Sequence, residues 1–303
     1  MAKAPEFDRS FEPRHGQPVP VAPGVVRVTA PNASAFTFLG TNSYLVGDDS
    51  VAVIDPGPAD AAHLAALLAA IGERPVSHIV VTHTHIDHSP LARALAARTG
   101  APIVGAAAHH AARDLFIGEV NPLDAAADRG HAPDRALGDG ERVAGEGFAL
   151  RTIATPGHAA NHLAFALEGT GIVFSGDHVM AWSTSIVAPP DGSMSDYMAS
   201  LDVMLARDDR LYLPGHGGPV DNPRAFVRGL KTHRRMRERA ILERLDRGDR
   251  TIPDMVAQIY RDTDPRLHGA AGLSVLAHLE DLVARALVTS DGPPAIDGRF
   301  APV

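Results

Sequence analysis

The amino-acid sequence predicts a layered α/β fold followed by a smaller C-terminal region. Short β-branched runs alternate with Ala- and Leu-rich stretches of helical spacing, which is typical of α/β architectures. Several of these runs end directly in a histidine or an aspartate. The chain up to Pro223 has 14 basic and 25 acidic residues, whereas the chain from Arg224 onward has 14 basic and 11 acidic residues. The net charge therefore changes from −11 to +3, which indicates a domain boundary.

The composition of the 303 residues is that of an ordinary globular protein, with 45% hydrophobic and 21% charged residues. The chain has no cysteine, so a metal ion would have to be held by histidine, aspartate or glutamate. No run approaches the roughly 18 apolar residues of a transmembrane helix, and residues 1–20 show no secretory signal. These observations predict a cytoplasmic enzyme without a membrane partner.

The first half of the chain is read as strands, turns and helices in alternation. Residues 1–23 are Pro-rich and polar, and we expect them to form an arm on the surface. The elements expected next are strands at 25–28 and 35–38, consecutive strands within 40–57, a helix at 59–71, a strand at 78–82, and a helix from Pro90 to about Thr99 with Ser89 as its N-cap.

The pattern loosens between residues 106 and 147, where we expect one or two short helices and a loop that is a candidate active-site lid. The strands expected after this region are at 148–153, 163–167, 172–177 and 211–213, and a helix capped by Ser195 is expected between the last two.

Residues 78–89 contain the densest group of side chains that can carry chemistry. A β-branched run leads there into His83, His85, Asp87 and His88. A strand that ends at this point would direct several imidazoles and a carboxylate into one small volume, and these ligands suit Zn²⁺. The alternative is a loop with surface histidines, which is disfavoured because similar contexts recur downstream.

The spacing His-x-His-x-Asp-His resembles the signature of the metallo-β-lactamase-fold hydrolases. This resemblance implies an αββα sandwich, in which two β-sheets lie back to back with helices outside, and a small winged-helix-like domain at the C-terminus. The expected division of the chain is an N-terminal arm at 1–23, a metallo-β-lactamase domain at 24–223 and a winged-helix-like domain at 224–303.

Three downstream strand ends carry further candidate ligands, because Pro-Gly turns precede two histidines and a glycine precedes an aspartate. The resemblance assigns one metal to His83, His85 and His158, a second metal to Asp87, His88 and His216, and a bridging role to Asp177. It implies two Zn²⁺, with Mn²⁺ or Fe²⁺ as alternatives, and a hydroxide that bridges them and attacks the substrate. Asp87 and Asp177 are therefore the expected catalytic residues.

The other histidines of the chain are weaker candidates. We expect His162 to orient a ligand or to be structural, and His178 to be a neighbour of the site. We expect His109, His110 and His131 to be solvated loop residues rather than ligands.

Within the superfamily, the sequence is most similar to the β-lactamase-like protein two branch. The segments that carry this similarity are 40–47, with the sequence GTNSYLVG, 175–180 and 195–201. The branch also implies the C-terminal winged-helix-like domain, with helices at 252–260 and 273–286 and a wing at 287–303. The chain departs from this branch at Ser89-Pro90-Leu91, where many relatives have a pair of glycines, so the entrance to the following helix differs.

A basic stripe is expected on the helix that follows the charge boundary. Its members at helical spacing are Arg224, Arg228, Lys231, Arg235 and Arg239. The stripe can be read as a phosphate-binding surface for RNA or as a solvated face that pairs with the acidic first domain. The expected substrate contacts are Tyr44, Trp182, Thr184, Lys231 and Arg235.

The function predicted first is a dinuclear zinc-dependent hydrolase that acts on single-stranded RNA or another phosphodiester. The alternatives are a thioester or ester hydrolase of the glyoxalase-II-like type, a weak or promiscuous β-lactamase, and a non-catalytic nucleic-acid-binding module. The expected partner is RNA or a small-molecule substrate, and an oligomer is compatible with the sequence.

Overall fold

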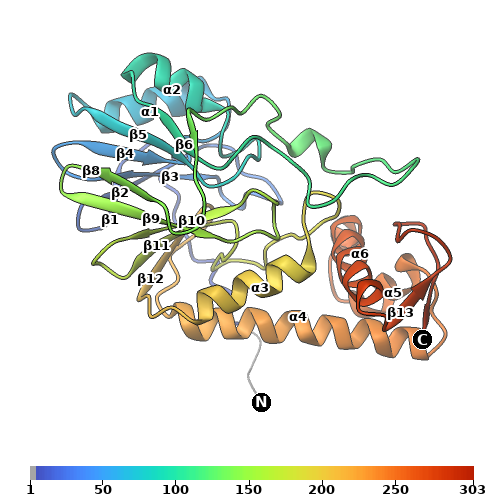
Figure 1. The fold of residues 1–303 in the computed structure, drawn as a ribbon. Helices are drawn as coiled ribbons and strands as arrows, with labels where there is room; N and C mark the ends of the chain where they lie inside the picture. Colours follow the sequence, from blue (N-terminus) through green and yellow to red (C-terminus); the bar gives the residue numbers. More distant parts are fainter. Residues whose placement is uncertain (1–4) are drawn as a thin grey trace.

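The computed structural model describes residues 5–303, which form two β-sheets packed face to face with helices on both outer sides (Figure 1). The seven-stranded sheet contains, in spatial order, β1 (Val19–Ala22), β2 (Val25–Thr29), β3 (Asn42–Val46), β4 (Val51–Ile54), β5 (Val76–Val81), β6 (Ile103–Gly105) and β7 (Arg135–Ala136). The five-stranded sheet contains β12 (Leu211–Pro214), β11 (Ile172–Gly176), β10 (Leu163–Leu167), β9 (Phe148–Ala154) and β8 (Arg142–Gly145). This arrangement confirms the predicted αββα sandwich.

The space between the two sheets is filled by large apolar side chains. Ile54 and Val80 of the first sheet pack in one cluster with Leu150, Phe165 and Phe174 of the second sheet, and all are at most 1% exposed. Burial of these side chains supplies the main favourable free energy of folding and fixes the distance between the sheets.

The helices of the sandwich form its two outer layers. The helices α1 (Ala61–Ile71) and α2 (Leu91–Thr99) bury Leu67 and Leu95 against the seven-stranded sheet. The helices α3 (Met194–Leu205) and α4 (Pro223–Asp246) bury Tyr197 and Val227 against the five-stranded sheet. Helix α4 continues beyond the sandwich to the C-terminal domain (Figure 1).

The C-terminal domain has its own core around Ile241, Met255 and Leu279. Its elements are the far end of α4, α5 (Ile252–Ile259), the short 3-10 helix η2 (Pro265–Leu267), α6 (His268–Ala284), and a hairpin of β13 (Val288–Ser290) and β14 (Phe300–Pro302). The helices and the hairpin agree with the predicted winged-helix-like domain. Among residues 5–303, no helix is both long enough and apolar enough to cross a bilayer.

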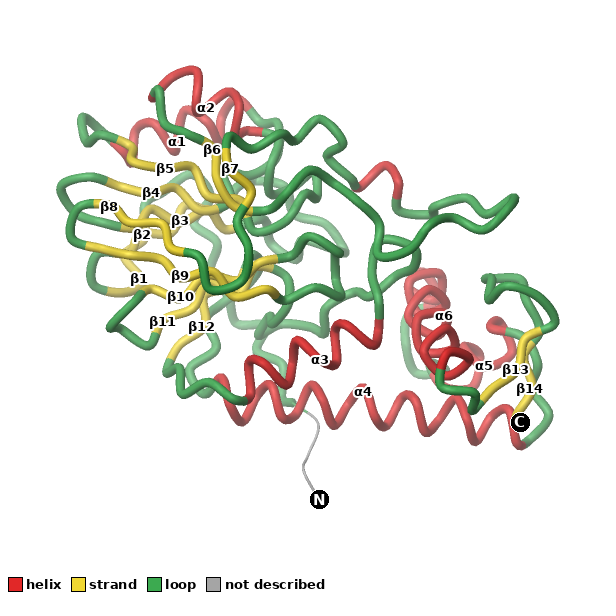
Figure 2. Tube along the Cα trace, viewed as in Figure 1, coloured by secondary structure: helices red, strands yellow, loops and turns green. Residues whose placement is uncertain are grey.

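The strands deliver their following loops to one edge of the sandwich. β4, β5 and β6 run parallel in the first sheet, and β11 and β12 run parallel in the second, so their carboxyl ends meet. Figure 2 shows long loops beyond the strand ends on one side of the sheets. At this edge the backbone N–H of Leu163 donates to the carbonyl of Thr82 at 2.8 Å and joins the two sheets.

The N-terminal boundaries differ from those predicted. Residues 19–22, placed in the surface arm, form β1, which pairs with β2; prolines are compatible with an edge strand. Residues 1–4 of that arm lie outside the described residues. Residues 35–38 form a turn instead of a strand, because the Thr37 hydroxyl donates to the Asn32 carbonyl at 2.5 Å and closes the loop locally.

Two predicted helix caps were also wrong. The Ser89 hydroxyl donates to Asp128 at 2.6 Å and does not cap α2, which begins after Pro90. The N-cap of α3 is Ser193, whose hydroxyl accepts from the Asp196 amide, and Ser195 lies inside the helix. In the first case a distant acceptor engages the serine, and in the second a nearby serine takes the capping position. The loose region 106–147 contains the 3-10 helix η1 (Asp124–Ala126) in a long loop, and it also contains the strands β7 and β8, which were not predicted.

Replacement of Phe174 by alanine is expected to lower the free energy of unfolding by about 3–5 kcal/mol, because it leaves a cavity between the sheets. Urea unfolding measures the change. Leu115→Ala is the control, since this side chain is 51% exposed and its loss should change stability by about 0.5 kcal/mol or less. Equal midpoints for the two variants would contradict the placement of Phe174.

Candidate metal centre

Three buried histidines form the first ligand group at the edge where the strands end. His83 and His85 follow β5, and His158 follows β9. The Nε2 atom of His83 lies 3.1 Å from Nδ1 of His85, and Nε2 of His158 lies 3.0 Å from the same atom. Three imidazole nitrogens at such distances can share one metal ion.

A second group lies beside the first and contains Asp87, His88 and His216, the last of which follows β12. The Asp87 Oδ2 atom is 3.1 Å from Nε2 of His216 and 3.3 Å from Nε2 of His88. This set of one carboxylate and two imidazoles can also hold a divalent metal.

Asp177, at the end of β11, lies between the two groups. Its Oδ2 atom is 3.2 Å from Nε2 of His216 in the second group and 3.7 Å from Nε2 of His158 in the first. Its Oδ1 atom is 3.5 Å from Nε2 of His88. One carboxylate therefore faces ligands of both groups, which is the position that a metal-bridging residue requires.

The donor set fits metal ions on physical grounds. Within residues 5–303, Nε2 of His88 and Oδ1 of Asp177 are buried without a hydrogen-bond partner. A buried polar atom without a partner costs about 1–3 kcal/mol, so such atoms usually have an unseen one. Because the nitrogens and oxygens point at one another, a metal at each group would satisfy them.

Asp55 is a buried residue, 2% exposed, whose carboxylate orients candidate metal ligands. Asp55 accepts from the amide and the hydroxyl of Thr82 at 2.8 and 2.7 Å, and from Nδ1 of His88 at 3.0 Å. The Thr82 hydroxyl in turn lies 3.0 Å from Nδ1 of His83. These contacts leave Nε2 of His83 and His88 available for metals, as partners of metal-binding histidines commonly do.

Backbone carbonyls orient two further ligands. His158 Nδ1 donates to the Ile186 carbonyl at 2.6 Å, and His216 Nδ1 donates to the Gly40 carbonyl at 3.2 Å. His162 is oriented differently, because its Nε2 accepts from the backbone amide of Asp177 at 3.1 Å. His162 is thus engaged with the backbone beside the Asp177 carboxylate.

Burial and charge divide the histidines into two classes. Burial lowers the pKa of all three histidines of the first group, to about 3 for His85. Burial alone would also lower the pKa of His88 and His216. There, however, the carboxylates of Asp87 and Asp177 raise the pKa of His216 to about 9 and that of His88 well above its ordinary value. Without metal, the second group therefore holds protons that the first group lacks.

The predicted substrate contacts are not all near these ligands. Tyr44 lies in the core between the sheets and donates to the Pro214 carbonyl at 2.7 Å, so its prediction as a pocket residue was wrong. Lys231 forms an ion pair with Asp202 of α3, and Arg235 is exposed on α4. The position of Lys231 depends on the packing of α3 against α4, which the spacing of basic residues in the sequence did not reveal.

Trp182 and Thr184 follow the Asp177 strand and are half-buried. The Trp182 ring stacks on Phe38, with ring centroids 4.8 Å apart. A Cβ on Gly217, the residue after His216, would lie 3.0 Å from the Trp182 ring, so this ring packs on the backbone next to His216.

The expectation that the loop histidines are solvated is corrected for His109 and His131. The side chain of His109 is 3% exposed, with Nδ1 3.2 Å from the Thr84 hydroxyl and Nε2 3.6 Å from Asp191. His131 is 5% exposed and contacts the Ala106 carbonyl. The loop folds back over residues 84–86, which periodicity alone does not reveal. His110 is exposed.

The sequence analysis missed Asp55 as a residue of the site. Its signal is the same as that of Asp177: a carboxylate directly after a buried apolar strand, here Val51–Ile54. Thr41 was also missed, and its hydroxyl donates to Asp87 at 3.3 Å.

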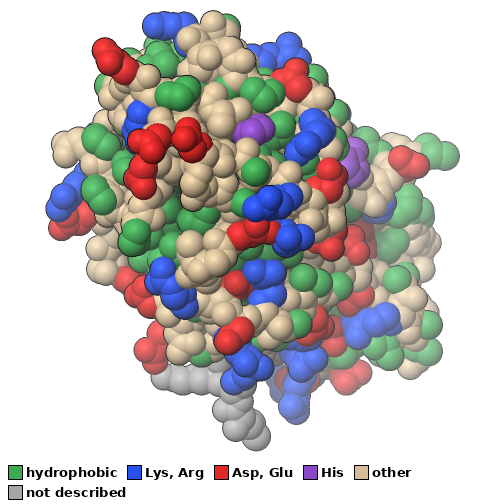
Figure 3. All heavy atoms as spheres, turned by 60° about the vertical axis from the view of Figure 1, so that its left-hand side comes forward, with side chains coloured by type: hydrophobic (Ala, Val, Ile, Leu, Met, Phe, Trp, Pro, Cys, Tyr) green, Lys and Arg blue, Asp and Glu red, His purple; other side chains and the backbone are tan. Residues whose placement is uncertain are grey.

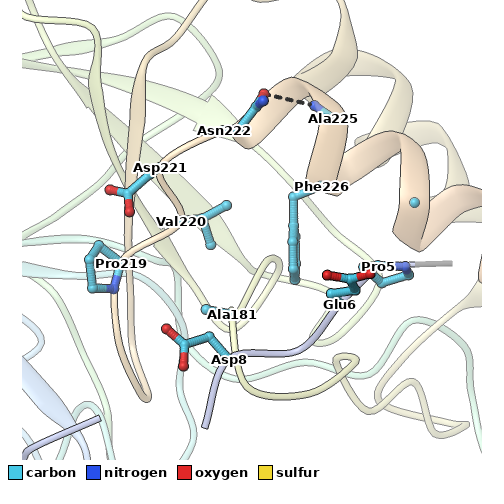
Figure 4. A pocket seen from close by; sticks show the side chains of 11 residues that line it. Pro5, Glu6, Asp8, Ala181, Pro219, Val220, Asp221, Asn222, Ala225 and Phe226 are labelled. Carbon is cyan, nitrogen blue, oxygen red and sulfur yellow. Dashed lines mark hydrogen bonds between the residues drawn. The ribbon is translucent and has the colours of Figure 1, made fainter. Parts of the chain in front are cut away.

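A separate hollow of about 480 Å³ lies at the start of α4. Figure 4 shows Phe226 and Val220 in this hollow, together with the carboxylates of Glu6, Asp8 and Asp221. None of its lining residues belongs to the two ligand groups. The hollow is therefore not the metal centre.

Comparison with protein families gives two matches. A family model described as the metallo-beta-lactamase superfamily matches residues 36–216. A model described as the beta-lactamase associated winged helix domain matches residues 251–295.

Individual relatives agree with these matches. A beta-lactamase-like protein 2 homolog of Drosophila melanogaster is 29% identical over 85% of this chain and 87% of its own length. An atrochrysone carboxyl ACP thioesterase of Paecilomyces divaricatus is 30% identical over 80% of this chain and 72% of its own length. The crystal structure of a metallo-beta-lactamase family protein from Thermus thermophilus has 27% identity and a TM-score of 0.74, and the match covers 93% of this chain and 99% of that one.

Asp55→Asn is expected to lower metal affinity about 10- to 100-fold, because the amide holds His88 and Thr82 less firmly than the carboxylate. Competition with a chromophoric chelator measures the affinity. Asp60→Asn is a matched control: Asp60 caps α1, asparagine caps equally well, and metal affinity should not change. Equal affinities of the Asp55 variant and the wild type would refute the role of Asp55.

Metal binding is expected to release protons at one ligand group only. At pH 7 the metal-free second group is protonated, because the pKa of His216 is about 9, and a ligating imidazole must be neutral. The affinity of this group should therefore rise as pH increases towards 9. The first group is already neutral and should bind independently of pH over this range. Calorimetry in buffers of different ionisation enthalpy measures the protons, and release by neither metal equivalent would contradict this assignment.

Proposed function

The chain belongs to the metallo-beta-lactamase superfamily, and from this premise we propose that it is a hydrolase with two zinc ions that cleaves thioesters. The observation that carries the proposal is the position of Asp177, whose carboxylate faces His158 of one ligand group and His216 of the other. A single-metal site would not need a carboxylate between two complete ligand groups.

The candidate ligands would bind the two zinc ions in two sets. His83, His85 and His158 would hold one ion, and Asp87, His88 and His216 would hold the other. When bound, two such ions lower the pKa of a bound water and polarise the bond to be cleaved. Hydrolysis of a thioester adds water across the C–S bond and yields a carboxylic acid and a thiol.

Asp87 is suited to orient the attacking water. Its pKa is held well below the ordinary value: burial opposes this, but His88 and His216 outweigh burial, so the group is ionised at neutral pH. Its side chain is 19% exposed, compared with 1% for His216 and 9% for Asp177, so it is the ligand nearest to solvent among these three. The Thr41 hydroxyl donates a hydrogen bond to the Asp87 carboxylate and helps to hold it in place.

Exposed apolar side chains on two segments connected to Asp87 favour an acyl substrate. Ile86, its neighbour in the chain, is 47% exposed. Phe36 is 53% exposed at the tip of loop 32–40, and this loop is fastened to Thr41 by the Asn32 side chain at 2.8 and 2.9 Å. Exposed apolar side chains can bind an acyl chain, whereas a polyanion would gain little from them. The similarity to ACP thioesterases supports the same substrate class.

Cleavage of single-stranded RNA is the second candidate, and the exposed arginines of α4 favour it. Arg224, Arg228, Arg235 and Arg239 are exposed. Two features weaken it: Lys231 is paired with Asp202, and Arg239 is paired with Glu243 at 2.9 Å. On the face drawn in Figure 3, basic and acidic side chains are interspersed and do not form a basic patch.

His83→Ala and Asp177→Ala are each expected to lower thioester hydrolysis about 10²–10³-fold or more, because each removes charge stabilisation at the reacting bond. Both variants should also bind less zinc per chain. Zinc analysis and a thiol-release assay measure these effects. Asp49→Ala, an exposed carboxylate, should keep both properties. Full activity of either ligand variant would refute the proposed site.

The double variant Lys231→Glu with Arg235→Glu separates the two substrate classes. If the protein is a thioesterase, thioester hydrolysis should stay within about twofold of the wild type, because neither residue belongs to a ligand group: Lys231 is paired with Asp202, and Arg235 is exposed. A selective loss of RNA cleavage in this variant, with chelator-sensitive RNA cleavage by the wild type, would favour the second candidate. The paired assay uses one preparation on a thioester and on single-stranded RNA.

A further inference from the structure

The turn that carries His158 is clamped by α3. The Ser193 amide donates to the Gly157 carbonyl at 2.9 Å, and the Ser200 hydroxyl donates to the Pro156 carbonyl at 2.7 Å. Gly157 has a φ of +134°, and a Cβ there would lie 2.4 Å from the Cα atom of Tyr197. The backbone of this metal ligand therefore has one position, set by the first turns of α3.

The ring of His158 is held from the other side. Its Nδ1 donates to the Ile186 carbonyl at 2.6 Å, and this contact turns Nε2 towards the metal position. The direction of the Ile186 carbonyl depends on the irregular segment 181–188, which belongs to no helix or strand. The orientation of the His158 ring therefore depends on contacts that other elements make with this segment.

Arg234 of α4 holds this segment. Its Nη2 donates to the carbonyl of Ser185, the residue directly before Ile186. Arg234 is only 3% exposed, although it lies in a helix rich in exposed arginines. A buried guanidinium is costly unless its donors are used, so its contacts have structural consequences.

The same guanidinium contacts two further helices. Its Nη1 donates to the Ser274 hydroxyl of α6 at 3.2 Å, and its Cζ lies 5.1 Å from the centroid of the Tyr197 ring of α3. The Tyr197 hydroxyl donates to the His178 carbonyl at 3.1 Å, just after the bridging Asp177. Ala277 of α6 is buried in the same cluster as Tyr197. Arg234 is thus the point where the C-terminal domain, α3 and the segment behind His158 meet.

We propose that Arg234 is a positioning residue that sets the ring orientation of His158 through the Ser185–Ile186 peptide, and that the C-terminal domain is thereby a working part of the metal centre. The inference rests on the proposed two-metal function, because it assigns His158 to one of the metals. It gives the winged-helix-like domain a task that requires no nucleic acid.

Arg234→Met tests the inference, because methionine fills similar space but cannot donate to Ser185. The variant should bind one of two zinc equivalents about tenfold more weakly, at the low end of the effect of losing an outer partner of a ligand. The visible spectrum of the cobalt(II)-loaded variant should also change. Arg234→Lys, which retains one donor, should recover part of both properties. Arg247→Met, an exposed arginine after the end of α4, is the matched control and should bind as the wild type does.

The outcomes separate the inference from the function on which it rests. Failure of the wild type to take up zinc or cobalt would overturn both. Two equivalents bound by the wild type, with unchanged affinity and cobalt spectrum in a folded Arg234→Met variant, would overturn the role of Arg234 alone. If Arg234→Met does not fold, Ser274→Ala replaces it, because this change removes one acceptor of Arg234 and should weaken the same equivalent to a smaller extent. An unchanged affinity and spectrum of Ser274→Ala would then overturn the inference.

Discussion

The contact of one carboxylate with histidines from both sheets is the constraint on which the rest of the structure depends. Asp177 comes from the second sheet, and His88, 3.5 Å from it, comes from the first. The two can meet only if the sheets keep one spacing and one relative register. The apolar core between the sheets and the hydrogen bond from Leu163 to Thr82 supply both. The apolar interior thus has a geometric task in addition to its contribution to stability.

Crowding at this edge explains the glycines that precede the ligands. A Cβ on Gly176, which has a φ of +49°, would lie 2.6 Å from Nε2 of His162. A Cβ on Gly215 would lie 2.5 Å from Oδ1 of Asp177. A larger residue at 176 would displace His162, which holds the backbone amide of Asp177, and one at 215 would displace the Asp177 carboxylate itself. The glycines before Asp177 and His216 are therefore required for packing as much as for turn formation.

Local patterns in the sequence predicted the order of strands and helices and the opening cluster of ligands, whereas the two-sheet sandwich and the assignment of the ligands to two metals came from the family resemblance. Strand runs are local, and so is the spacing of His83, His85 and Asp87. What the sequence could not predict depends on distant partners. Ser89 was predicted as a cap, but its hydroxyl is engaged by Asp128, and Lys231 was assigned to substrate, but it is engaged by Asp202. Asp55 has the same strand-end signal as Asp177, yet only the fold shows that it orients His88.

Helix α4 prevents a clean division of the chain into two separate domains. Residues 217–250 lie between the segments matched by the two family models, and α4 occupies Pro223–Asp246 of this interval. Neither family model includes the helix, so it would be taken for a linker between two domains. Physically it belongs to both sides, since Val227 is buried in the sandwich cluster and Ile241 in the C-terminal one. No cut along this helix separates two self-contained modules. A truncation within this helix would therefore remove an outer wall of the sandwich together with the C-terminal domain.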